Sequence, residues 1–200
     1  MRKLVLLCST LLMALITPAQ AGPPDEVRFG VVYHNIRTDH GDLAQPKEDG
    51  PNVEGEMVWS SPHWLHWLGA PRPYVMASIN TQGNTSFAST GVYWRIGFLH
   101  NWAFEPGFGI AVHDGELDIP RTLGRDNPAS TAFEAQHQLL GSRVLFRESF
   151  ALEHNITDHT AWQAYYEHLS NGQVFHHGRN QGLDEAGLRL LFRFNTDPAH

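Results

Sequence analysis

The sequence predicts an all-β protein, an eight-stranded antiparallel transmembrane β-barrel. The first observation is hydrophobicity that alternates with a period of two, as in residues 88–98, where one face is apolar and the other mostly polar or small. The second is the number of such segments, about eight, since an even number lets both chain ends lie on the same side of a membrane. The third is that short links alternate with long polar loops, which is typical of outer-membrane barrels.

The alternating segments can be placed along the whole chain. They lie near residues 26–37, 51–61, 73–81, 86–98, 101–114, 141–154, 158–170 and 182–194. Short links are expected at 99–101 and 155–157, and long polar loops at 38–50, 115–140 and 171–181. By this parity the loop 171–181 is extracellular. The link 62–72 is long and aromatic for a periplasmic turn, and its tryptophans favour the membrane interface.

The N-terminus has the features of a secretory signal peptide. Arg2 and Lys3 precede an apolar run that ends at Ile16, and residues 19–21 read Ala-Gln-Ala, a small-residue cleavage pattern. We therefore expect a signal peptide over 1–21 and one outer-membrane β-barrel domain over 22–200. The apolar run is shorter than the roughly 20 residues that a spanning helix needs. Together these features predict the outer membrane of a Gram-negative cell as the location.

Composition excludes several functional classes. The single cysteine, Cys8, lies in the expected signal peptide, so the mature chain has no disulfide and no thiol nucleophile. The chain has 14 Lys and Arg against 21 Asp and Glu, and loss of Arg2 and Lys3 leaves a net charge near −9. Such an acidic protein is not expected to bind nucleic acid.

A base, a hydroxyl and an acid are placed to meet in the last hairpin. His168 and Ser170 are two apart on a strand, so they share a face about 6.6 Å apart along the backbone. If the hairpin closes around the loop 171–181, Ser170 lies opposite Gly182 and His168 lies opposite Asp184, with Cβ atoms roughly 4.5–5.5 Å apart. This is the arrangement of a Ser-His-Asp hydrolase built on strands.

The strand face on which these residues lie indicates whether the site faces the barrel interior or the lipid. The three share their strand face with apolar residues, and in a transmembrane barrel the apolar face turns to lipid while the polar face lines the interior. The site is therefore expected to face outward. Charged residues of the opposite parity are expected to fill the interior as a polar network: Arg95, Glu105, Arg143, Arg147, Glu167, Arg189 and Arg193.

Several motifs resemble those of a known family, the outer-membrane lipid A 3-O-deacylases (PagL) and their acyloxyacyl-hydrolase-like relatives. Residues 168–171 (His-Leu-Ser-Asn) resemble the family's His-x-Ser-Asn run, and residues 180–184 (Asn-Gln-Gly-Leu-Asp) are similar to its Asn-x-Gly-x-acid run. Segments at 60–62, 71–73, 80–86 and 140–148 also resemble that group. The likeness covers nearly all of the mature chain and is most specific in its last thirty residues or so.

The resemblance implies an esterase that removes the 3-O-linked acyl chain of lipid A through a triad facing the outer leaflet. Carried over by position, Ser170 is the nucleophile and His168 the general base. The side-chain amide of Asn171 and the backbone N–H of Gly172 are candidates to stabilise the oxyanion. The family commonly has Glu as the acid, whereas Asp184 occupies that position here. Strand parity favours Asp184, because Glu185 should point into the barrel, and only a local bulge would pass the role to Glu185.

No cofactor and no metal are expected for this chemistry. The adjacent His176 and His177 point apart on an extended chain and are read as solvated loop residues rather than metal ligands. The expected partners are lipid A or lipopolysaccharide and the membrane, and the sequence leaves a homodimer open. The competing hypotheses are a non-enzymatic structural or adhesin-like outer-membrane barrel, and a secreted lipid-binding barrel with its apolar residues turned inward.

Overall fold

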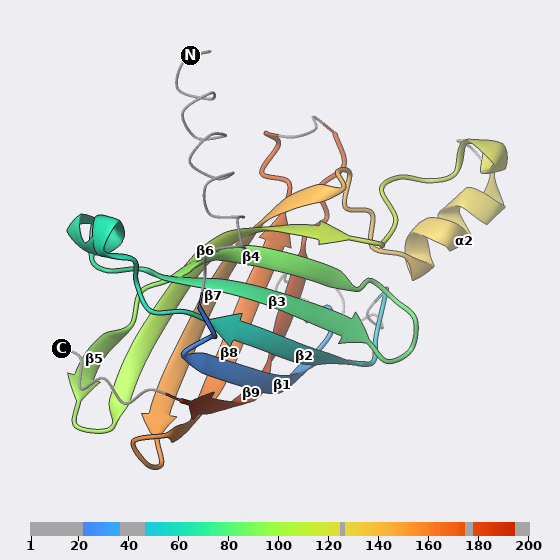
Figure 1. Cartoon of the computed structure of the whole chain (residues 1–200). Coiled ribbons are helices and arrows are strands. Elements are labelled where there is room, and N and C mark those ends of the chain that lie inside the picture. Colours follow the sequence, from blue (N-terminus) through green and yellow to red (C-terminus); the bar gives the residue numbers. More distant parts are fainter. Residues whose placement is uncertain (1–21, 37–46, 125–126, 175–177, 195–200) are drawn as a thin grey trace.

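The computed structural model describes residues 22–36, 47–124, 127–174 and 178–194. The chain forms one antiparallel sheet that closes into a barrel (Figure 1). The strands are β1 (Glu26–Tyr33), β2 (Pro51–Val58), β3 (Arg72–Asn80), β4 (Phe87–Tyr93), β5 (Ile96–Leu99), β6 (Trp102–His113), β7 (Val144–Asn155), β8 (Thr160–Ser170) and β9 (Leu183–Arg193). The pairing of β1 with β9 closes the sheet. The expected signal peptide and the last six residues lie outside the described residues.

The nine strands occupy eight positions, as the sequence predicts, because β4 and β5 both pair with β6. The segment 86–98 was expected to be one unbroken strand, and it is instead interrupted at Trp94 and Arg95. The interruption lies opposite Pro106 of β6, whose carbonyl accepts a hydrogen bond from Trp94 N at 3.0 Å. Proline has no N–H to donate to a neighbouring strand, so the ladder is weakened at this point.

The two ends of the barrel differ, as the expected loop lengths imply. The 3₁₀ helix η2 (His63–Leu68) lies at the end where the short links join β5 to β6 and β7 to β8. The 3₁₀ helix η3 (Arg121–Leu123) and the helix α2 (Pro128–Gln136) belong to the long connection at the opposite end, called the outer end below (Figure 1). Asn127 caps α2 by accepting a hydrogen bond from Ala129 N. None of the described helices is long and apolar enough to cross a membrane.

The barrel interior is filled by ion pairs between buried side chains. Arg28 contacts Glu105 at 2.5 Å and Arg189 contacts Glu54 at 2.8 Å, all with side chains at most 1% exposed. Further ion pairs bring the predicted Arg95, Arg147, Glu167 and Arg193 into the same network. Buried charges need such pairing, because an unpaired charge away from water is strongly unfavourable.

One member of the predicted interior network was placed wrongly. Arg143 is exposed and donates hydrogen bonds to the carbonyl oxygens of His113 and Gly115, at 3.2 and 2.8 Å. The reason is its position, since Arg143 precedes the first residue of β7 and is not held by the ladder that turns later odd-numbered residues inward.

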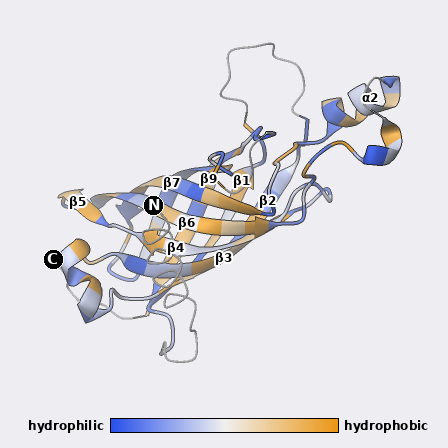
Figure 2. Ribbon diagram, turned by 90° about the horizontal axis from the view of Figure 1, so that it is seen from above, coloured by the Kyte–Doolittle hydropathy of each residue, from blue (hydrophilic) through white to orange (hydrophobic). Residues whose placement is uncertain are grey.

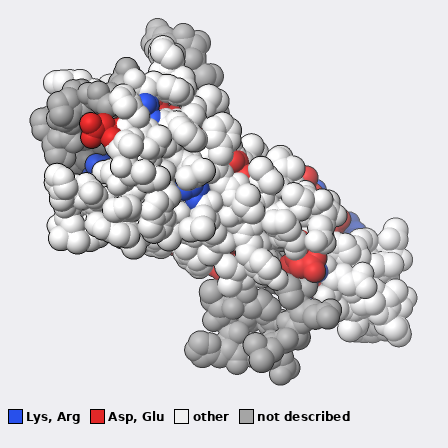
Figure 3. Space-filling view, turned by 90° about the horizontal axis from the view of Figure 1, so that it is seen from below, with Lys and Arg blue, Asp and Glu red and all other residues white. Residues whose placement is uncertain are grey.

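The outer surface of the barrel is apolar. Exposed large hydrophobic residues occur on most strands, including Phe29, Val53, Ile79, Phe108 and Leu188. Apolar and polar residues alternate along the strands (Figure 2), and the face seen in Figure 3 carries few charged side chains. Apolar residues outside and ion pairs inside invert the arrangement of a soluble barrel, which argues against the secreted lipid-binding alternative.

Candidate active site

His168 and Asp184 meet across the β8–β9 ladder. The two residues are register partners, and His168 Nδ1 lies 2.8 Å from Asp184 Oδ1. This is the pairing expected from the sequence. The two side chains are on the outward face, with His168 36% and Asp184 16% exposed, while the intervening Leu169 and Leu183 are buried.

Tyr166 adds a contact that the sequence reasoning missed. Its hydroxyl donates a hydrogen bond to Asp184 Oδ1 at 2.5 Å, so this one oxygen accepts from both the phenol and the imidazole. The sequence does contain a signal for this contact, because Tyr166 is two residues before His168 and therefore lies on the same strand face. The double contact holds the Asp184 carboxylate in a single orientation.

Ser170 is the last residue of β8 and is half-buried on the same face as His168. Its hydroxyl makes no hydrogen bond to any residue that the structure describes. Catalytic hydrogen bonds are often long without substrate and tighten when it binds. Across the hairpin, Gly182 has a φ of +69°, and a Cβ there would lie 3.0 Å from His168 Cε1. Glycine at this position therefore leaves room for the imidazole.

Asn171 ties the loop beyond the site to the rest of the outer end. Its buried side-chain amide donates to the carbonyl oxygens of Leu140 and Arg179, at 2.9 and 2.8 Å. Its Oδ1 accepts from Gln173 N at 2.8 Å. Both amide protons are thus engaged in this conformation. The neighbouring Gly172 N–H donates to no described residue and is the more available of the two candidate oxyanion donors.

Glu185, the alternative acid, lies on the other side of the barrel wall. Its carboxylate is fully buried and contacts His34 Nδ1 at 2.5 Å and Asn52 Nδ2 at 2.8 Å. The ladder runs without a bulge from Thr160 to Leu169, so parity holds and turns Glu185 inward. Of the two neighbouring acids, Asp184 is the one that contacts His168.

His34 links the interior beneath the site to the loop before β2. It follows β1 at the outer end and lies between Glu185 and Glu48, with Nε2 3.1 Å from the Glu48 carboxylate. Burial lowers the pKa of His34, but hydrogen bonds with the two carboxylates outweigh burial and raise the pKa to about 9. Glu48 also accepts from Gln138 N at 2.9 Å, which joins the loop before β2 to the loop before β7.

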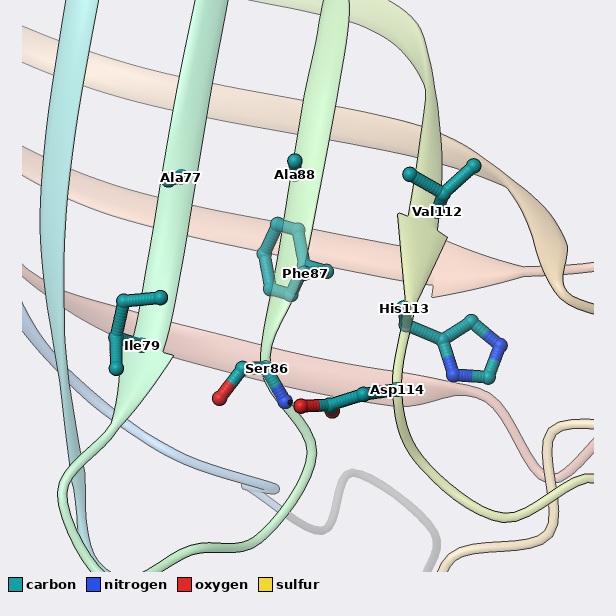
Figure 4. A pocket seen from close by; sticks show the side chains of 8 residues that line it. All are labelled: Ala77, Ile79, Ser86, Phe87, Ala88, Val112, His113 and Asp114. Atoms are coloured by element: carbon teal, nitrogen blue, oxygen red, sulfur yellow. Dashed lines mark hydrogen bonds between the residues drawn. The ribbon is translucent and has the colours of Figure 1, made fainter.

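A second set of Ser, His and Asp lies at the rim of a shallow hollow between β3, β4 and β6 (Figure 4). These residues are not connected as a triad. His113 Nε2 contacts the carbonyl oxygen of Ser142 at 2.7 Å, and Asp114 Oδ1 accepts from the backbone N–H of Ser86 at 2.8 Å. The Ser86 hydroxyl accepts from Asn80 N. The hydrogen bonds of this set support turns and strand ends, so we assign it no catalytic role.

Three interior carboxylates are close enough to hold a metal ion in principle. Glu54, Glu167 and Glu185 each offer an oxygen within 4.8 Å of the others. Each is already in contact with a cationic or ionisable partner, namely Arg189, Arg147 and His34 respectively. The cluster is therefore accounted for as part of the interior ion-pair network.

The closed sheet, with its apolar exterior and polar interior, defines the class of the protein as a small outer-membrane β-barrel. The model of the lipid A 3-O-deacylase (PagL) family matches residues 50–193. The chain therefore belongs to this family of ester hydrolases, as the resemblance in the sequence implied.

A solved outer-membrane enzyme has a similar fold. The crystal structure of the outer membrane enzyme PagL is similar with a TM-score of 0.58 at 14% identity, over 84% of this chain and 99% of that chain. The N-terminal β-barrel domain of Pseudomonas aeruginosa OprF gives 0.49 at 11% identity, over 86% and 100%. Neisserial surface protein A gives 0.48 at 9% identity, over 87% and 100%. No curated protein matches the chain.

Proposed function

We propose that this member of the lipid A 3-O-deacylase family cleaves its ester substrate with Ser170 as nucleophile, His168 as general base and Asp184 as the orienting acid. The observation that carries the proposal is the 2.8 Å contact between His168 Nδ1 and Asp184 Oδ1 on the outward face of the barrel. An imidazole held by a carboxylate at the lipid boundary, two residues from a hydroxyl, matches the chemistry that the family performs.

The contact fixes the tautomer of the base. When the Nδ1–H of His168 donates to Asp184, Nε2 is left unprotonated and accepts the proton of the Ser170 hydroxyl. The alkoxide attacks the ester carbonyl, and His168 then gives this proton to the departing sugar oxygen. Water, deprotonated by His168, next cleaves the acyl-enzyme and releases the fatty acid, which regenerates Ser170.

The oxyanion needs donors that are already in place before the reaction. The backbone N–H of Gly172 meets this requirement, since it has no acceptor among the described residues and lies two positions after the nucleophile. Asn171 supports it by fixing the loop through Leu140 and Arg179. Its own amide would act on the oxyanion only after releasing one of those carbonyls.

An outward site suits a substrate that stays in the membrane. His168 and Ser170 are at the outer end of β8. In an outer-membrane barrel with its long loops outside the cell, this end corresponds to the outer leaflet. The ester of a lipid in that leaflet reaches the site by lateral diffusion, with its acyl chains against the apolar barrel wall. The mechanism uses only protein groups and water.

Mass spectrometry of lipid A incubated with the refolded mature protein tests the proposal. The wild type is expected to remove one 3-hydroxyacyl mass, and Ser170→Ala is expected to remove none. Ser86→Ala is the matched control, because its hydroxyl lies in the unconnected Ser, His and Asp set and should be dispensable. A folded wild type that leaves lipid A intact would favour the non-enzymatic barrel instead.

A further inference from the structure

The outward face of the barrel has one polar patch, which contains Asp184 and Glu148. In the described strands, outward positions are almost entirely apolar, and two carboxylates break the pattern. One is Asp184. The other is Glu148 of β7, which is exposed and lies between the outward-facing Phe146 and Phe150. A carboxylate on the lipid-facing side of a barrel is unfavourable unless something compensates it.

Glu148 adjoins the triad directly. It is the register partner of His168 across the β7–β8 ladder, while Asp184 is the partner of His168 across β8–β9. The imidazole therefore has a carboxylate on each side along one row of the sheet, with Phe108 of β6 completing the row. Asp184 is engaged with His168 and Tyr166. Within the described residues Glu148 makes no hydrogen bond or ion pair, and its charge acts on His168 through space.

A carboxylate without a hydrogen-bond partner has a definite preference for what it contacts. It has acceptor oxygens and no proton to donate at neutral pH, so it binds N–H and O–H groups and repels phosphate. Glu148 lies diagonally across the β7–β8 ladder from Ser170, at the roughly 7–8 Å that separates such neighbours, a distance that its side chain and one sugar ring can span.

We propose that Glu148 is a specificity-determining residue that accepts hydrogen bonds from the hydroxyl or amide N–H groups beside the scissile ester of the substrate's sugar. This inference rests on the proposed function, because it assumes that the ester is cleaved at Ser170. Glu148 then orients the sugar with its donor groups over β7 and its phosphate away from that strand.

The experiment compares two esters on the refolded mature protein in micelles. One is lipid A, whose sugar supplies donor groups, and the other is a p-nitrophenyl ester of equal chain length, which has none near the carbonyl. The variants are Glu148→Ala and Glu148→Gln, with Leu152→Ala as a control at another outward position of β7. We expect Glu148→Ala to lower kcat/KM for lipid A about 10- to 100-fold, mainly through KM.

The two substrates separate the possible outcomes. The proposal requires the loss on lipid A to exceed the loss on the p-nitrophenyl ester by at least tenfold, with Glu148→Gln intermediate. Equal losses on both esters, with a shifted pH profile, would overturn it and assign Glu148 to the electrostatics of His168. No loss on either ester would overturn it and leave a solvated surface carboxylate. A wild type that cleaves neither ester would instead refute the triad itself.

Discussion

Replacing Asp184 with asparagine removes one charge from the site and leaves its shape nearly unchanged. In the wild type, Oδ1 accepts hydrogen bonds from both His168 Nδ1 and the Tyr166 hydroxyl. The asparagine oxygen can keep both contacts, because both donors converge on the same atom. The imidazole should therefore keep its tautomer in Asp184→Asn, and the loss should be mainly electrostatic.

The magnitude follows from the distance and the exposure. Opposite charges about 4 Å apart interact by about 4 kcal/mol at the effective dielectric of a protein surface. His168 is 36% exposed, and the interaction is therefore partly screened by solvent. A loss of about 2–4 kcal/mol of stabilisation of the imidazolium corresponds to a decrease in kcat of roughly 30- to 1000-fold. Asp184→Ala also removes the acceptor and should lower kcat further.

The assay is the rate of 3-hydroxyacyl loss from lipid A, followed by mass spectrometry, with heat-modifiable gel mobility as the check on folding. Tyr166→Phe serves as the companion variant, since it keeps the charge of Asp184 and removes only one of its two donors. It should lower kcat less than Asp184→Asn does. Wild-type activity in a folded Asp184→Asn protein would refute the assignment of Asp184 as the orienting acid.

Three further predictions concern the site and the barrel interior. Gly182→Ala should lower activity at least tenfold, because the new Cβ would lie 3.0 Å from His168 Cε1. Gly83→Ala is the control: Gly83 also has a positive φ but no atom nearby, so this variant should lose some stability and no activity. Reaction rates and melting midpoints of the two variants, measured in parallel, check this. The raised pKa of His34 stabilises the folded state by about 3 kcal/mol below pH 6.5, and this contribution should disappear as the pH rises through about 9. Unfolding midpoints in micelles between pH 6 and 10 measure it, and an equal decline in His34→Gln would contradict the assignment. Glu105→Gln should destabilise the barrel by about 3 kcal/mol, because the buried guanidinium of Arg28 loses part of its counter-charge. Denaturant unfolding, with activity as a second readout, tests this.

Much of the fold could be predicted because a barrel strand repeats a simple pattern. Alternation with a period of two located all eight barrel positions to within a few residues, and loop lengths separated the two ends. The break between β4 and β5 was not predicted, because it depends on which residue of the neighbouring strand lies opposite Trp94. That residue is Pro106 of β6, and only the register of the folded sheet brings the two together. Arg143 was misplaced for a related reason, since parity applies only where the ladder continues.

The sequence by itself determined that His168, Ser170 and Asp184 share a strand face, because side-chain direction alternates strictly along a strand and the hairpin loop limits the register. The tertiary structure alone decided which partners complete that face. It brought the Tyr166 hydroxyl to Asp184, paired the inward-facing Glu185 with His34, and placed Glu148 of a separate strand beside the imidazole. These contacts depend on rotamers and on pairing between strands, which no local pattern encodes.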